Sequence, residues 1–187
     1  MGALRSFFVG GGRTAPIFLL EVIPMRNRSR KLAHGALIAA LYAVLTHMQN
    51  ILLPGSATWA IQLRLSEALC VLAFFTPAAI PGLTVGCLIF NLTYAAALPT
   101  DWILGSLATF FATWAMRRLR RHPLPGLLMP ALFNAILVGW ELTVYIGGGF
   151  WLNALYVAIG EAVVLLTFGT ILYTAIKKRR MDTMLFG

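Results

Sequence analysis

The sequence contains few charged residues: Asp, Glu, Lys and Arg together make up 11% of its 187 residues, whereas soluble domains contain about 25%. Apolar residues make up 59%, and the mean hydropathy is +0.81, so neither a water-soluble globule nor a disordered chain is expected. Only two cysteines are present, which excludes a disulfide scaffold. A chain of this composition is expected to lie in a membrane.

Motifs for nucleotide and metal chemistry are also missing from the sequence. The glycine run at 10–12 is followed by Arg13 and Thr14 and lacks the lysine of a phosphate-binding loop. No HExxH motif, paired CxxC motif or aspartate-rich cluster is present to hold a metal ion. Because the serines and threonines have no base partner at an obvious spacing, we expect neither an enzyme nor a cofactor on this chain.

Six apolar runs set the expected fold. One membrane span with its connection takes roughly 30 residues, so the chain accommodates about six. We therefore predict an all-α integral membrane protein, a compact six-helix bundle that forms a single domain over residues 25–187. Prolines and glycines mark the break between the second and third helices. The predicted helices cover 33–53, 66–80, 81–98, 102–117, 125–146 and 152–176.

The positive charge is grouped at the ends of these runs. The net charge is +9, and 12 of the 15 Lys and Arg residues fall in three clusters of four, within 26–31, 117–121 and 177–180. Such clusters are typical of cytoplasmic helix ends. Six spans with both termini in the cytoplasm place every cluster inside, whereas five or seven spans do not. No aromatic residues interleave with a basic groove, so nucleic-acid binding is not expected.

The first 24 residues do not fit this plan. An apolar run over 15–25 is interrupted by Glu21 and Pro24 and is too short to span a bilayer. No cleavage site follows it, so a signal peptide is not expected. Met25 begins a stretch typical of the start of a membrane protein whose N-terminus is inside. Residues 1–24 are interpreted as a mis-assigned start or a disordered tail, with an amphipathic surface segment as the alternative.

Carboxyl groups lie within or beside the apolar runs. A carboxylate near the bilayer centre costs about 2.5–3.5 kcal/mol on insertion scales, so it usually faces a cavity or a partner. With a rise of 1.5 Å per residue, Glu161 lies roughly 14 Å deep, near the midplane. Glu141 falls in the outer third of its helix, and Glu67 lies near the outer start of the second helix. Asp101 is expected to act as a helix N-cap.

Neutral polar residues also gather in the outer half of the bundle. Asn134, Glu141 and Tyr145 share one helix face, and Arg64 can reach Glu67 at a spacing of three. Because the inner half has nothing comparable, the pattern predicts a water-accessible pocket that opens to the outside. Interhelical hydrogen bonds and interfacial aromatic anchors are the alternative. The outer polar residues are Asn91, Tyr94, Asn134, Tyr145, Asn153 and Tyr156.

The first helix carries a stripe of small residues. Ala36, Ala39, Ala40 and Ala43 form two overlapping pairs at a spacing of four. Such faces let another helix approach closely, either inside the bundle or in a second membrane subunit.

Several longer stretches of the chain are similar to a known family. A small six-helix protein with an outward pocket, a small-residue stripe and no nucleotide site resembles the substrate-binding (S) component of an energy-coupling factor (ECF) transporter. The resemblance to the QueT family of such components covers about 32–176, although Phe90 stands where a smaller residue is expected. The matching stretches are IQLRLSEAL (61–69), FFTPAAIPGLTVGCLIFNL (74–92), LGSLAT (104–109), LFNAILVGWEL (132–142) and FWLNALYVAIGE (150–161).

The resemblance implies partners and a substrate. One transmembrane coupling subunit (T) and two cytoplasmic ABC ATPases would complete an importer in the bacterial cytoplasmic membrane, and those ATPases would hydrolyse ATP. Ala36 and Ala40 are the candidate coupling contact, with Ala39 and Ala43 beside them. The expected ligand is a queuosine precursor of the 7-deazaguanine type: the 7-aminomethyl or 7-cyano compound, or the base queuine. An S component for another vitamin or nucleobase, and a stand-alone secondary transporter, are the alternatives.

The chemistry of such a ligand suits the residues available. A guanine edge presents adjacent N–H and NH2 donors that one carboxylate can accept, and an aminomethyl cation favours a second carboxylate. We expect Glu161 or Glu141 to bind the guanine edge and the other to bind the amine. Arg64 and Glu67 are expected to fix the first outer loop. The polar shell and the aromatic stacking or lid candidates are Asn91, Asn134, Asn153, Tyr145, Tyr156, Trp59 and Trp151.

Overall fold

The computed structural model describes residues 17–56 and 61–179, with residues 17–27 described as backbone only. Within this part of the chain every regular element is helical. The elements are α1 (Ile17–Leu52), the 3₁₀-helix η1 (Leu65–Val71), α2 (Leu72–Phe75), α3 (Ala79–Thr93), α4 (Asp101–Arg118), α5 (Pro123–Leu127), α6 (Met129–Tyr145), α7 (Phe150–Val164), the π-helical turn η2 (Leu165–Gly169) and α8 (Thr170–Lys178).

These elements join into six helical segments, which confirms the predicted number and order. η1 continues into α2, α5 leads into α6, and α7, η2 and α8 form one continuous helix. The predicted starts and ends agree within a few residues except that the first helix begins at Ile17 rather than at residue 33, and the second ends at Phe75 rather than at residue 80. The predicted end of the third helix at residue 98 is also late, because α3 ends at Thr93.

Three of the helices in the described residues are long and apolar enough to cross a membrane. They are Arg28–Leu52, Pro123–Tyr145 and Phe150–Lys178, whereas Leu65–Phe75 and Ala79–Thr93 are shorter apolar helices. The break between these two shorter helices follows from proline chemistry, because Pro77 lacks the amide hydrogen needed to continue α2. Arg117 of α4 donates to the carbonyl oxygen of Phe74 over 2.8 Å and so satisfies the C-terminal end of α2.

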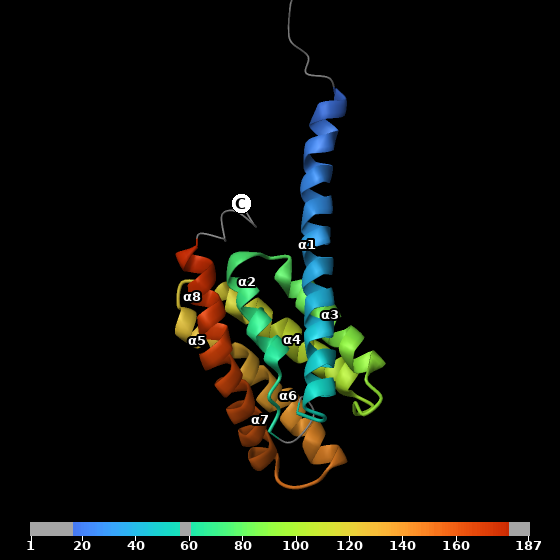
Figure 1. The fold of residues 1–187 in the computed structure, drawn as a ribbon, viewed down its shortest axis with the longest axis vertical. Helices are drawn as coiled ribbons and strands as arrows, with labels where there is room; N and C mark the ends of the chain where they lie inside the picture. Colours follow the sequence, from blue (N-terminus) through green and yellow to red (C-terminus); the bar gives the residue numbers. More distant parts are fainter. Residues whose placement is uncertain (1–16, 57–60, 180–187) are drawn as a thin grey trace, which may run out of the picture.

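Neighbouring helices form a curved wall around η1 and α2. α1 packs beside α3, α3 beside α4, α4 beside α6, and α6 beside α7, while η1 contacts α1, α3, α4, α7 and α8 (Figure 1). The short η1 helix therefore lies at the centre of the bundle. This position explains why the segment that precedes and forms η1 brings its polar side chains into the interior.

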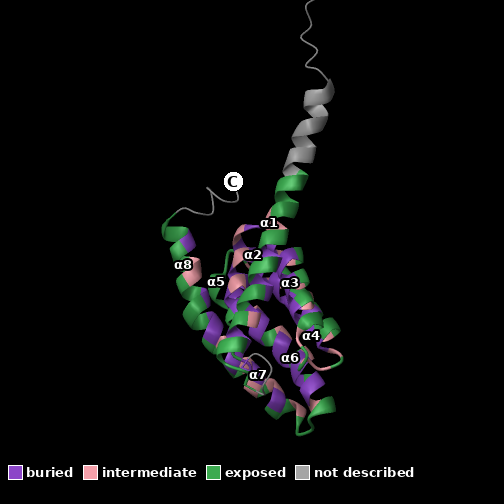
Figure 2. Ribbon diagram, turned by 45° about the vertical axis from the view of Figure 1, so that its right-hand side comes forward, coloured by how far each residue is buried: buried purple, intermediate pink, exposed green. Residues whose placement is uncertain are grey.

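The surface of the bundle is apolar, and part of its interior is polar. Buried residues line the inward sides of α3, α4 and α6, and exposed residues follow the outer sides of α1 and α8 (Figure 2). Leu37, Trp114 and Phe168 are among the many large apolar side chains that are exposed, while Arg64 and Glu161 are buried. Soluble proteins rarely expose apolar surface so continuously. The distribution is that of a helical membrane protein.

Glycines set the contact between α1 and α3. A Cβ atom at Gly82 would lie 2.6 Å from the carbonyl oxygen of Gly35, and one at Gly86 would lie 2.8 Å from that of Ala39. The two helix backbones can approach this closely because no side chain separates them. The inward face of α1 is therefore held firmly against α3.

Candidate functional site

Five ionisable residues form a buried group, called here the central cluster. Each is at most 3% exposed. They interact electrostatically: Arg64 with Asp101 and Glu161, Glu141 with Asp101 and Arg64, and Glu161 with Glu67. The cluster brings one arginine together with four acidic residues from four segments of the chain. Its members are Arg64, which precedes η1, Glu67 of η1, Asp101 of α4, Glu141 of α6 and Glu161 of α7.

Both carboxylate oxygens of Glu67 are bonded inside the protein. The Tyr42 hydroxyl donates to Oε1 over 2.5 Å, and the Cys70 thiol donates to Oε2 over 3.0 Å. Glu67 and Cys70 face each other because residues three apart align along a 3₁₀-helix. Glu67 therefore differs from the other two glutamates of the cluster, which keep free oxygens.

Glu161 is bonded on one side only. The Asn134 amide donates to its Oε1 over 2.9 Å, which ties α7 to α6. Among the described residues, neither Oε2 of Glu161 nor Oδ1 of Asn134 has a hydrogen-bond partner, although both atoms are buried. The close approach of α7 to the residues before η1 depends on Gly160, where a Cβ atom would lie 2.5 Å from the carbonyl oxygen of Gln62.

Glu141 shows the same one-sided pattern. The Thr100 hydroxyl donates to its Oε1, while its Oε2 is buried without a partner in the part of the chain that the structure describes. Nearby, the Asn91 amide donates to the carbonyl oxygen of Asp101 over 2.8 Å. The Asp101 carboxylate accepts the backbone N–H of Leu98 over 2.6 Å. The prediction that Asp101 is an N-cap is wrong, because α4 begins at Asp101 and the cap position falls on Thr100.

The buried oxygens left over at this site share one property: they are acceptors. A buried polar atom without a partner costs about 1–3 kcal/mol, so native proteins keep few of them. Several such atoms around one cluster suit a small molecule that brings N–H donors. Within residues 17–56 and 61–179, the unpartnered acceptors at this site are Gln62 Oε1, Asn91 Oδ1, Asn134 Oδ1, Glu141 Oε2 and Glu161 Oε2.

The remaining predicted ligand residues lie elsewhere or face outward. The Asn153 amide donates to the Thr143 hydroxyl and to the carbonyl oxygen of Gly147, both over 3.0 Å, and so holds the turn between α6 and α7. Trp151 is 83% exposed and Tyr145 45% exposed. The structure does not bring these residues into the central cluster. Tyr156 is half-buried, and Trp59 lies outside the described residues.

Residues on α1 at this site were missed from the sequence. Tyr42, Thr46 and Gln49 are buried and lie at spacings of four and three, which places them on one helix face. The sequence did contain this periodic polar signal. This signal is weaker than the alanine stripe that the same helix carries.

The alanine stripe divides into two pairs in the structure. Ala39 and Ala43 are buried, and Ala39 packs on Gly86 of α3, whereas Ala36 and Ala40 are exposed. Ala36 lies in a groove of about 230 Å³ between α1 and α3 that Pro81 also lines. Of the four alanines, therefore, Ala36 and Ala40 are exposed, and the buried Ala39 lines the same groove as Ala36.

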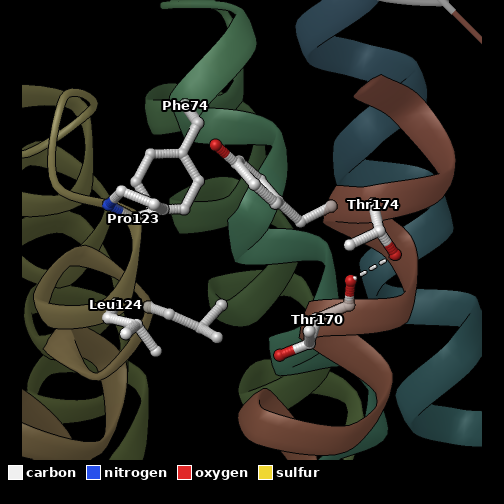
Figure 3. Close-up of a pocket in the computed structure, with 7 residues that line it drawn as sticks. Phe74, Pro123, Leu124, Thr170 and Thr174 are labelled. Carbon is white, nitrogen blue, oxygen red and sulfur yellow. Dashed lines mark hydrogen bonds between the residues drawn. The ribbon is translucent and has the colours of Figure 1, made fainter. Parts of the chain in front are cut away.

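A cavity of about 200 Å³ lies between α2, α5 and α8. Phe74, Pro123 and Leu124 give it an apolar lining, and the Thr174 hydroxyl donates to the carbonyl oxygen of Thr170 over 2.8 Å rather than into the cavity (Figure 3). Thr170 lies nine residues beyond Glu161, or about 13 Å along the helix. This cavity is therefore separate from the central cluster and lacks its acceptors.

The apolar surface and the long apolar helices of the described residues are those of a helical membrane protein. The chain belongs to the QueT family: the family model described as QueT transporter matches residues 32–178. This match confirms the resemblance seen in the sequence, includes the whole central cluster and identifies a transporter family rather than an enzyme family. Searches of curated proteins and of solved structures give no match.

Proposed function

We propose that this chain is the S component of an ECF-type importer and that it binds a 7-deazaguanine queuosine precursor from outside the cell. The membership of the QueT transporter family supports the class of protein. The observation that carries the ligand proposal is the group of buried, unpartnered acceptor oxygens around the central cluster in the described residues. A ligand that fits them must be small, polar and rich in N–H donors.

The 7-aminomethyl precursor has these properties. Its guanine edge carries adjacent N–H and NH2 donors, its five-membered ring carries another N–H, and its side chain carries an ammonium group. Glu161 Oε2 and Glu141 Oε2 accept from the guanine edge and from the ammonium group. Asn91 and Asn134 supply further acceptors around them. Charge-assisted hydrogen bonds to carboxylates are stronger than neutral ones, so these two glutamates contribute most to affinity.

The proposed partners are those that the resemblance to S components implies. Binding requires no cofactor on this chain, and ATP is hydrolysed by two cytoplasmic ABC ATPases joined to it through a transmembrane T subunit. The exposed pair Ala36 and Ala40 forms the contact with that subunit, because small residues allow a second helix to approach closely. The chain lies in the bacterial cytoplasmic membrane with both termini inside.

Calorimetric titration tests the ligand proposal. Detergent-purified protein is titrated with 7-aminomethyl-7-deazaguanine, 7-cyano-7-deazaguanine, queuine and guanine. We expect saturable heat with at least one deazaguanine and weaker heat with guanine. Absence of binding to all four compounds would overturn the ligand, while tight binding of guanine alone would favour a nucleobase importer.

Uptake into proteoliposomes separates the S component from a stand-alone transporter. Vesicles that contain this chain with its T subunit and ATPases are expected to accumulate ligand only when ATP is supplied inside the compartment that holds the ATPases. Accumulation by the chain alone, without the partner subunits, would instead favour a secondary transporter.

A further inference from the structure

Tyr42 joins α1 to the central cluster through Glu67. Its side chain is fully buried, and its hydroxyl donates to Oε1 of Glu67 over 2.5 Å. Cys70 donates to the other oxygen of the same carboxylate over 3.0 Å. Donors from two helices therefore hold the Glu67 carboxylate in one orientation.

Two further residues of α1 hold the chain next to Glu67. Thr46 lies one turn after Tyr42, and its hydroxyl forms a hydrogen bond with the Ser66 hydroxyl over 2.7 Å. Gln49 lies almost one turn further, and its side-chain Oε1 accepts the backbone N–H of Leu65 over 2.8 Å. Successive turns of α1 thus bind consecutive residues at the start of η1 and connect this segment to α1.

The orientation of Glu67 affects the residue that carries a free carboxylate oxygen. Glu67 and Glu161 interact electrostatically inside the bundle, where charges are poorly screened. The charge of Glu67 adds to the negative potential around Glu161, while the positive charge of Arg64 opposes it. A cationic ligand gains from that potential, and a neutral ligand of the same shape gains less.

We propose that Tyr42 is a positioning residue of the ligand site: its hydroxyl orients the Glu67 carboxylate and thereby favours a cationic ligand at Glu161. This inference rests on the proposed function, because it concerns the same site. Tyr42 holds the site on the inward face, and the exposed Ala36 and Ala40 lie on the outward face of the same helix.

The substitution Tyr42→Phe isolates the hydroxyl. The ring belongs to the apolar core cluster that also contains Leu83 and Cys87, and phenylalanine keeps the ring there. Thr46→Val is a matched control, because it removes a hydroxyl that holds the adjacent Ser66 from the same helix face but does not touch a carboxylate. Glu67→Gln removes the charge that Tyr42 is proposed to orient.

Calorimetry on the detergent-purified full chain measures the effect with a cationic and a neutral probe, the 7-aminomethyl and 7-cyano deazaguanines. We expect Tyr42→Phe to weaken binding of the cationic probe about tenfold, and binding of the neutral probe clearly less. The double variant is expected to bind as Glu67→Gln alone does, because Tyr42 acts through Glu67. Thr46→Val is expected to leave the ratio of the two affinities unchanged.

Other outcomes overturn the inference. They are an unchanged affinity in Tyr42→Phe, an equal loss for both probes, or losses that add in the double variant. If the wild-type protein binds neither probe, the proposed function fails separately. In that case, unfolding is measured on four ligand-free proteins: the wild type, Tyr42→Phe, Glu67→Gln and the double variant. Changes in the free energy of unfolding that are additive contradict the role of Tyr42 in holding Glu67. A coupling energy between the two positions supports it.

Discussion

Asn134 and Glu161 face each other across α6 and α7, with the amide of Asn134 donating to Oε1 of Glu161 over 2.9 Å. This bond fixes the carboxylate while using only one of its oxygens. The second oxygen is buried and has no partner within the described residues. The pair therefore combines rigidity with an unused acceptor, which is what a preorganised binding site requires.

Replacement of Glu161 by Gln tests this arrangement directly. The substitution keeps the size of the side chain but removes the charge, so we expect ligand binding to weaken by on the order of 1.5–3 kcal/mol. Calorimetric titration of the purified protein measures the change. Tyr145→Phe serves as the control, because Tyr145 is exposed and lies outside the central cluster. An affinity that is unchanged in Glu161→Gln would remove this residue from the ligand site.

Gly86 gives a prediction about stability rather than binding. A Cβ atom there would lie 2.8 Å from both the carbonyl oxygen of Ala39 and the Cβ atom of Tyr42, so α1 must shift to admit it. We expect Gly86→Ala to lower the free energy of unfolding by about 1–3 kcal/mol. Gly149→Ala is the matched control, because a Cβ atom there meets no described atom within 4 Å. Thermal unfolding in detergent measures both, and equal melting temperatures would contradict close α1–α3 packing.

The sequence predicts the helices of this fold well because their signals are local. Apolar runs mark the segments, and Pro77 marks the break between α2 and α3. The sequence also predicts that Glu141 and Glu161 face the interior rather than the lipid, and both are buried in the structure. These predictions depend on spacing along the chain alone.

The contacts between site residues depend on how the helices pack, because the residues involved are far apart in the sequence. A helical period predicts that Asn134 and Tyr145 share a face, but Asn134 is buried in the interior and Tyr145 is exposed near the helix end. Arg64 is buried because the short η1 helix lies at the centre of the bundle, which a run of apolar residues does not reveal. Tyr42 reaches Glu67 across 25 positions of sequence. Such contacts become visible only when the helices are placed side by side.

Asn153 has a structural role in the turn between α6 and α7 rather than the ligand role predicted for it. The sequence places it among the ligand residues, whereas its amide donates to Thr143 and Gly147 in the turn between α6 and α7. We expect Asn153→Ala to lower the free energy of unfolding by about 1–3 kcal/mol, through the loss of two hydrogen bonds. Ligand affinity is expected to stay within about twofold of the wild-type value. Chemical denaturation and calorimetry measure the two effects, and a tenfold loss of affinity would return Asn153 to the ligand site.

The divided alanine stripe of α1 predicts different defects for neighbouring positions. Ala36 and Ala40 are exposed, so leucine at both is expected to preserve folding and ligand binding but to abolish ATP-driven uptake by blocking the approach of a partner helix. Leucine at Ala39, which packs against Gly86 of α3, is expected to destabilise the isolated protein by about 1–3 kcal/mol. Uptake into proteoliposomes with the partner subunits, calorimetry and thermal unfolding measure the three properties. Normal uptake by the Ala36→Leu/Ala40→Leu variant would show that the outward face of α1 is not the coupling contact, because two bulky side chains cannot fit into a close helix–helix interface.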